Sequence, residues 1–270
     1  MEVVYPNGAK KALTLRFDDG AVSDRQMVKL LNNYKLKATF YPIAKYISND
    51  GFVTKEEFRT LYDGHEIGNH TYSHIDPRCN EMTSAEVKAE LEKGKETLKT
   101  IWDGKIEGYA YVCSSYGNTG EEEYKKILAE TGHKYAIMGR ENYSFEPNIN
   151  DRFDVGHSFR FSDDALIEKA KEYTEFNAEK LSLFFTMAHS YEFDLPQYDY
   201  GWNKVEEFFG IISNRDDIWY ATNGEVIGYL LAAEEFAAHN CGKDIFENTT
   251  EYDIYLKSGN EIIVVPKGNY

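Results

Sequence analysis

Cysteine, basic residues and long apolar runs are scarce in this 270-residue sequence, and each shortage excludes a class of protein. The three cysteines, Cys79, Cys113 and Cys241, are widely spaced and form no C-x-x-C pair, so they predict neither a disulfide framework nor a thiolate zinc site. No apolar stretch approaches the roughly 20 residues of a transmembrane helix. Residues 1–6 lack the basic and apolar regions of a signal peptide. The sequence therefore predicts a cytoplasmic protein, or an extracytoplasmic one from which a signal has been removed.

Negative charge exceeds positive charge, because 46 Asp and Glu residues oppose 30 Lys and Arg residues and give a formal net charge of −16 at pH 7. A surface this acidic argues against a nucleic acid or an anionic membrane as a partner. We therefore expect neither. The sequence leaves the oligomeric state open.

Strand-like and helix-like segments alternate along the chain, which is typical of a parallel α/β fold. With 42% hydrophobic and 28% charged residues the composition is that of a globular protein, and barrels of this length are often single domains. The patterning predicts strands at 12–17, 37–42, 65–69, 109–113, 134–138, 181–188 and 218–221. It predicts helices that begin at Ser23, Thr54 and Thr83, and further helices near 119–131, 164–178, 201–213 and 223–238. The pattern Ser23-Asp24-Arg25-Gln26 also predicts a capping box at the first helix.

The last thirty residues change in character. Two β-like segments, 252–256 and 261–265, flank Ser258-Gly259-Asn260, which is a hairpin signal. We predict a barrel domain over 1–241 and a small β appendage over 242–270 that packs on the barrel as a structural cap. A lone hairpin is marginal as an independent module.

Two carboxylates and two imidazoles carry the strongest chemical signal in the chain. Asp18 and Asp19 end an apolar run and are closed by Gly20, and successive side chains of a strand point in opposite directions. The pair therefore suits a division of labour in which one carboxylate binds a metal and the other stays free as a base. His70 and His74, four positions apart, lie on one side of a turn and can share a cation. One carboxylate and two imidazoles leave coordination positions open, as in a catalytic metal site.

Each half of this pattern has an ordinary explanation when it stands alone. Asp-Asp-Gly is most often a turn, and a His-x-x-x-His pair often lies on the surface or caps a helix. Both motifs occur here in this order and spacing, each after a strand-like segment. Together they favour a catalytic metal site over a turn and a surface His pair.

These motifs resemble those of a known family. Phe17-Asp18-Asp19-Gly20 and the segment from His70 to His74 are similar to the first two motifs of the polysaccharide deacetylases (carbohydrate esterase family four, with the NodB-like homology domain). Ser115-Tyr116-Gly117 falls at the place of the third motif, and the segment that ends in His189 resembles the last one. The resemblance spans about residues 10 to 235. It implies an irregular (β/α)7 barrel.

The resemblance also implies roles for individual residues. Asp19, His70 and His74 would hold a divalent metal, with Zn²⁺ as the default and Co²⁺ or Ni²⁺ as alternatives. Asp18 would be the general base, His189 would protonate the departing amine, and the backbone N–H of Tyr116 would form an oxyanion hole. Thr71 would hold the His-bearing loop by a local hydrogen bond. The candidates for contact with sugar are Tyr72, Tyr116, Tyr191, Trp202 and His157, the last with a structural role as an equal alternative.

One departure from the family pattern concerns the cation that orients the catalytic Asp. The family's third motif commonly carries an Arg and a Pro, whereas residues 110–117 contain no Arg and have Ser115 at the place of the Pro. A buried base needs a cation to stay ionised. We expect Arg140 to reach Asp18, with Arg16 as the second candidate, since Arg16 shares its face of the strand. Arg152 and Arg160 are weaker candidates.

The expected function is that of a metal-dependent hydrolase that removes acetyl groups from N-acetylated or O-acetylated carbohydrate. The negative charge makes a neutral or N-acetylated glycan an easier substrate than an anionic polymer. Two alternatives stay open: a C–N hydrolase of a non-sugar amide or cyclic imide, and a catalytically impaired glycan-binding relative. The sequence does not specify the sugar.

Overall fold

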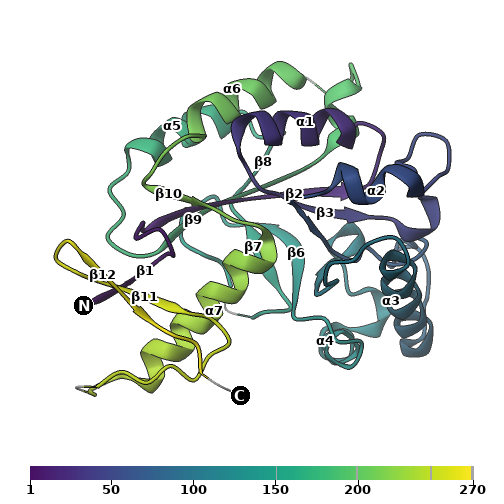
Figure 1. Ribbon diagram of the computed structural model, residues 1–270. Coiled ribbons are helices and arrows are strands. Elements are labelled where there is room, and N and C mark those ends of the chain that lie inside the picture. The colour runs from purple at the N-terminus through teal and green to yellow at the C-terminus, as the bar shows by residue number, and fades with distance from the viewer. Residues whose placement is uncertain (150, 199, 244, 269–270) are drawn as a thin grey trace.

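A computed structural model describes residues 1–149, 151–198, 200–243 and 245–268 of the chain. Strands and helices alternate through most of it, as predicted (Figure 1). The strands are β1 (Glu2–Val4), β2 (Lys11–Asp19), β3 (Thr39–Pro42), β4 (Glu66–Ile67), β5 (Gly108–Ala110), β6 (Tyr135–Glu141), β7 (Val155–His157), β8 (Phe159–Arg160), β9 (Ser182–His189), β10 (Ile218–Tyr220), β11 (Ile254–Ser258) and β12 (Glu261–Val265). The α-helices are α1 (Asp24–Tyr34), α2 (Lys55–Leu61), α3 (Ser84–Lys99), α4 (Glu121–Glu130), α5 (Leu166–Glu175), α6 (Trp202–Ile212) and α7 (Asn223–His239). The short 3-10 turns are η1 (Ala44–Tyr46), η2 (Val112–Ser114), η3 (Gly117–Thr119) and η4 (Ser190–Asp194).

Strand β2 is the centre of the larger sheet, whose strands all run parallel. On one side β9 pairs with β2 from Lys11 to Asp18. On the other side β10 pairs with the first half of β2 and β3 with the second half. Strands β4 and β8 extend this sheet at its two edges. Because β2 is paired on both sides and covered on both faces, every residue from Lys11 to Asp18 is buried, and most of them are apolar.

A second parallel sheet, β5-β6-β7, continues the curve of the first. The two sheets meet at an isolated bridge between Asn69 and Tyr109 and at a hydrogen bond from Ser158 N to Phe185 O. In the described part of the chain the strands therefore form an irregular, incompletely closed barrel.

Helices cover the outside of the sheets. Figure 1 shows α1, α5 and α6 together over β2, with α3 and α4 beside the second sheet and α7 near β11. Leu13, Leu15 and Phe17 of β2 point toward α1, α5 and α6 and belong to an aromatic-rich core with Phe208 and Phe209. Arg16 and Asp18 lie on the opposite face of the strand, inside the barrel. No helix of the described residues is long and apolar enough to span a bilayer.

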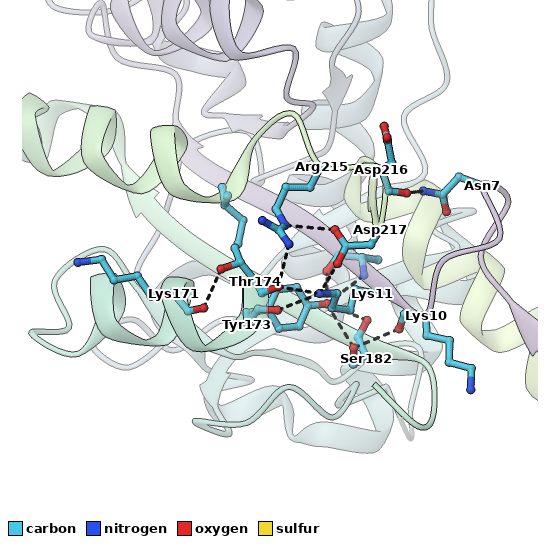
Figure 2. Close-up of polar contacts among 12 residues, drawn as sticks. Asn7, Lys10, Lys11, Lys171, Tyr173, Thr174, Ser182, Arg215, Asp216 and Asp217 are labelled. Carbon is cyan, nitrogen blue, oxygen red and sulfur yellow. Dashed lines mark hydrogen bonds and ion pairs between the residues drawn. The ribbon is translucent and has the colours of Figure 1, made fainter. Parts of the chain in front are cut away.

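A polar cluster anchors the first residue of β2 (Figure 2). The buried Lys11 ammonium lies 2.6 Å from an Asp217 carboxylate oxygen and donates to the carbonyl oxygens of Tyr173 and Thr174, each at 3.2 Å. Arg215 also donates to Thr174 O, at 2.9 Å. Both cations therefore satisfy free carbonyl groups at the C-terminal end of α5, where the helix dipole favours positive charge.

Two of the three expected N-terminal caps are present. Thr54 and Thr83 each form a full capping box with the Glu three residues later. The capping box predicted at Ser23 is wrong. Ser23 has φ −62° and ψ −18°, whereas a capping residue adopts extended geometry, so its hydroxyl cannot bond back to the helix. The hydroxyl donates to Asp194 instead, and this bond ties the start of α1 to the segment after β9.

The predicted hairpin is formed by β11 and β12, with Gly259 in the left-handed region at its turn. Strand β1 adds to it by pairing with β11, which the sequence did not predict. Ile254 and Leu256 are buried in a core with residues of α7. The boundary at residue 241 stays a prediction, and residues 244, 269 and 270 of the appendage lie outside the described residues.

Candidate metal centre and active site

The ends of three strands deliver the candidate residues to one edge of the barrel. Asp18 pairs in register with His189, so the ends of β2 and β9 lie side by side. His70 follows the end of β4 after a short connection. Asp19 has φ 79°, in the left-handed region that Asp tolerates better than most residues. The carboxyl ends of parallel strands are where active sites of α/β proteins collect.

Asp19, His70 and His74 converge on one point. Asp19 Oδ1 lies 3.5 Å from Nε2 of His70 and 3.5 Å from Nε2 of His74. It is buried and has no hydrogen-bond partner among the described residues. The Nδ1 of His70 bonds to Ala110 O at 2.8 Å, so its Nε2 is the free nitrogen. Burial lowers the pKa of His70 to about 4, which keeps the imidazole neutral.

These observations fit a divalent cation. A carboxylate oxygen without a partner in the described part of the chain, beside two imidazole nitrogens, is a donor set that zinc and similar ions accept. The loop that carries both imidazoles is held locally, since His74 N donates to Thr71 Oγ1 at 3.0 Å. This is a local hydrogen bond of the His-bearing loop, as we expected for Thr71.

Asp18 is held by Arg16, which lies on the same face of β2. Arg16 Nε donates to Asp18 Oδ1 at 2.8 Å and Nη2 to Oδ2 at 2.5 Å, and the side chains are 2% and 3% exposed. Burial acts to raise the pKa of Asp18, but Arg16, together with His70 and His189, holds it well below its usual value. The carboxylate is therefore ionised and fixed in orientation by a bidentate pair.

The predicted contact between Arg140 and Asp18 is wrong. The Arg140 side chain is 58% exposed and its Nη1 lies 3.0 Å from Asp154 Oδ2. Arg140 stands near the end of β6, where the strand leaves the barrel interior and becomes exposed. Arg16, the second candidate, occupies the position beside Asp18 that we expected for Arg140. Arg160 pairs with Glu141, and Arg152 lies over the ring of Phe153.

His189 faces the same centre and has a carboxylate behind it. Its Nε2 lies 3.9 Å from Asp19 Oδ2, and its Nδ1 donates to Glu192 Oε1 at 3.0 Å. Tyr200 OH in turn donates to Glu192 Oε2 at 3.0 Å. Burial acts to lower the pKa of His189, but Glu192, Asp18 and Asp19 outweigh it and raise the pKa above its usual value. The imidazole therefore tends to carry a proton at Nε2, directed at the centre.

Comparison with known proteins identifies a family for part of the chain. Residues 6–136 match the family model described as polysaccharide deacetylase. This region belongs to the polysaccharide deacetylase family. A peptidoglycan-N-acetylglucosamine deacetylase of Bacillus cereus is 38% identical over 72 residues, which is 26% of this chain and 32% of the relative. A peptidoglycan-N-acetylmuramic acid deacetylase of Bacillus subtilis is 33% identical over 125 residues, which is 45% of this chain and 24% of the relative. The chain thus spans a third or less of the length of these two deacetylases.

Solved structures of the family share the fold. A putative polysaccharide deacetylase from Mycobacterium smegmatis superimposes with a TM-score of 0.61 at 18% identity, over 92% of this chain and 97% of that one. A family 4 carbohydrate esterase from Streptomyces lividans, in complex with acetate, gives 0.54 at 12% identity, over 79% and 93%. The predicted α/β barrel class is confirmed. A family pseudoenzyme from Bacillus anthracis also matches, with a TM-score of 0.52 at 13% identity over 84% and 68%, so the fold alone does not decide activity.

The remaining candidates lie at different distances from the candidate metal centre. The Tyr191 ring is half-buried, with its centroid 5.2 Å from that of His189. Tyr72 is covered by the Lys93 ammonium, 3.8 Å from its ring centroid. Trp202 donates from Nε1 to Asp194 and packs on Phe193.

His157 and Tyr116 differ from the other candidates in what surrounds them. The role predicted for His157 in substrate contact is wrong, because its side chain is 0% exposed and its Nε2 lies 3.5 Å from Glu141 Oε1 inside the barrel. Tyr116 is half-buried, and its ring packs against Tyr111. The role of its backbone N–H as an oxyanion donor stays a prediction.

A buried carboxyl group near the site has no recognisable signal in the sequence. Asp24, the first residue of α1, is fully buried and accepts hydrogen bonds from Tyr62 OH at 2.6 Å and Ser190 Oγ at 2.5 Å. Burial raises the pKa of Asp24 to about 7. Ser190 follows His189, so Asp24 helps to fix the segment that carries the candidate acid. An Asp at a helix start looks like an ordinary first-turn acid in the sequence.

Proposed function

We propose that this protein is a metal-dependent hydrolase that removes acetyl groups from N-acetylated or O-acetylated carbohydrate. One observation carries the proposal. Around Asp19 stand the imidazoles of His70 and His74, a separate carboxylate fixed by a guanidinium, and a third imidazole that tends to be protonated. These are the parts that hydrolysis of an unactivated amide or ester requires.

Each part has a distinct task. Asp19, His70 and His74 would hold the cation, which supplies Lewis acidity at the scissile carbonyl. Asp18 accepts a proton from the attacking water as the new C–O bond forms. His189 then gives the proton at Nε2 to the departing amine or alcohol as the C–N or C–O bond breaks, and acetate is the second product. Glu192 keeps His189 protonated and oriented before this step.

The pairing of Asp18 with Arg16 favours an active enzyme over an impaired relative. The third motif of this chain lacks an Arg, but Arg16 supplies a guanidinium to the same carboxylate from within β2. The base therefore has the cation that a buried carboxylate needs.

An acetylated amino sugar is the substrate class that we favour. The relatives whose names state a substrate act on N-acetylglucosamine or N-acetylmuramic acid of peptidoglycan. The net charge of −16 disfavours strongly anionic polymers. Zn²⁺ is the default cation for one carboxylate and two imidazoles, and Co²⁺ or Ni²⁺ would fit the same ligands.

Acetate release from a panel of N-acetylated and O-acetylated oligosaccharides tests this function, with simple amides and cyclic imides in the same panel. We expect acetate from at least one saccharide, and loss of that activity in His70→Ala. His239→Ala is the matched control, because His239 lies at the end of α7 and pairs only with exposed groups. Turnover of an amide or imide without any acetate release from saccharides would contradict the proposal.

A further inference from the structure

A large cavity lies at the end of the barrel opposite to the candidate active site. Its volume is about 1030 Å³. Its walls are residues before or at the starts of β3, β4, β5 and β6, Arg152 before β7, residues of α7 between Gly224 and Glu235, and residues 250–252. The candidate metal ligands follow the other ends of β2 and β4, so the two sites are separate. The volume is at the upper limit of what small-ligand sites usually offer, about 300–1,000 Å³.

The strand order brings the start of α7 to this end of the barrel. Strand β3 begins beside Arg16, whereas β2 begins at Lys11, and β10 takes the place beside the first residues of β2. The chain before β3, at Lys37, and the chain after β10, at Thr222, both line the cavity, and Asn223 N donates to Thr39 Oγ1 at 2.8 Å between them. The cavity lies beside α7, whose residues between Gly224 and Glu235 contribute to its wall.

A buried donor in the cavity wall lacks a partner. His65 is 7% exposed, and its Nδ1 accepts a hydrogen bond from Ala38 N at 3.3 Å, so the proton is on Nε2. That Nε2 has no acceptor within the described part of the chain. Buried polar groups normally have partners, so this one points to a ligand or a water at the site. The adjacent residue, Glu66, supplies carboxylate oxygens that accept from Tyr135 OH and Gly224 N, each at 2.8 Å.

The remaining wall combines flat apolar faces with balanced charge. Trp102 and Tyr252 are both half-buried and line the cavity, Trp102 from the segment before β5 and Tyr252 from the appendage. Four basic and five acidic side chains line the cavity, and Lys37 pairs with Glu225 at 2.7 Å. This near balance contrasts with the net charge of −16 for the whole chain. A neutral ligand that presents both donors and acceptors suits such a wall better than an ion does.

We propose that this cavity is a second, non-catalytic binding site for a neutral saccharide. Hydroxyl groups accept from His65 Nε2 and donate to Glu66, and the apolar faces of sugar rings pack on Trp102 and Tyr252. The proposal does not depend on the chemistry proposed for the other end of the barrel. Its test therefore uses binding, and acetate release tests the enzymatic proposal separately.

Fluorine NMR of protein labelled with 5-fluorotryptophan locates the ligand. The chain has three tryptophans, Trp102 at the cavity, Trp202 near the candidate active site and Trp219 in β10, and single Trp→Phe variants assign their resonances. The trisaccharide of N-acetylglucosamine, maltotriose and inorganic phosphate are titrated into wild type and into Asp19→Ala. We expect a saccharide to shift the Trp102 resonance saturably and equally in both proteins.

Calorimetry on Asp19→Ala, which lacks one candidate metal ligand, then measures the affinity. Adding Trp102→Ala or Tyr252→Ala should weaken saccharide binding about tenfold, which is the effect of losing one ring contact. Adding Trp202→Ala, the matched change at the other end, should leave it unchanged. A Trp102 resonance that responds to neither saccharide, or only to phosphate, would overturn the proposal. A response of Trp202 alone would overturn it as well, by placing the saccharide at the catalytic end.

Discussion

Replacing Arg16 by methionine should cost far more stability and activity than replacing Arg140. The Arg16 and Asp18 side chains are 2% and 3% exposed and form a bidentate pair, so methionine would leave a buried carboxylate without its cation. Removal of one partner of a buried pair typically costs about 3–5 kcal/mol of unfolding free energy. Activity should fall roughly 10–100-fold or more, the range seen when a group that orients a catalytic residue is removed.

The pH dependence of the remaining activity gives a second readout. Arg16 lowers the pKa of Asp18, and burial alone would raise it. In Arg16→Met the base therefore takes up a proton at higher pH than in the wild type. The acidic limb of the pH–rate profile should move to higher pH, while its basic limb stays in place.

Arg140→Met is the matched control for Arg16→Met. Arg140 pairs with Asp154 at the surface, where an ion pair contributes within about 1 kcal/mol, so urea denaturation should hardly distinguish this variant from wild type. The double variant Arg16→Met, Asp18→Asn should recover part of the lost stability, because no buried charge is left unpaired. Equal losses in Arg16→Met and Arg140→Met would refute the assignment of Arg16 as the partner of Asp18.

Three further outcomes follow from other contacts. Asp18→Asn should reduce turnover by about 10²–10⁴-fold while bound metal, measured by mass spectrometry, is retained; loss of both would show that Asp18 is a ligand. Glu192→Gln should lower the pKa of His189 and therefore move the basic limb of the pH–rate profile to lower pH. Trp202→Phe, which alters a contact to Asp194 instead, should leave that limb in place. An unmoved limb in Glu192→Gln would show that Glu192 does not set the pKa of His189. Asp24 binds a proton more tightly in the folded state, so in metal-free protein its contribution to the free energy of unfolding should fall by a few kcal/mol as pH rises from about 4 to about 7. Asp24→Asn should abolish that part of the decline, as measured by urea denaturation. An unchanged decline would contradict the burial argument.

The sequence predicts the candidate site better than it predicts the contacts behind it. Asp18, Asp19, His70 and His189 follow strand-like runs, and parallel strands bring their carboxyl ends to one edge, so their proximity is expected from the pattern. The choice between Arg16 and Arg140 depends on the direction in which a long side chain near the end of its strand points. The alternation of side chains along β2 favoured Arg16, and the structure shows that this local argument was the better one.

Several elements of the fold lie beyond sequence patterning. Strands β7 and β8 have only three and two residues, too few to show a period. Strand β1 is recognisable only through its pairing with β11, which lies about 250 residues later in the chain. Ser23 and Thr54 stand in similar sequence contexts, yet only Thr54 caps its helix, because the backbone entering α1 is already helical at Ser23. Such outcomes depend on tertiary contacts.

Metal removal and restoration tests the central claim most directly. Protein treated with a chelator should release no acetate from an acetylated oligosaccharide, and added Zn²⁺ should restore activity in proportion to the metal bound, up to about one ion per chain. The Asp19→Ala, His70→Ala variant should neither bind the ion nor regain activity. Acetate release by metal-free wild type, or by that double variant, would contradict a metal centre at Asp19, His70 and His74.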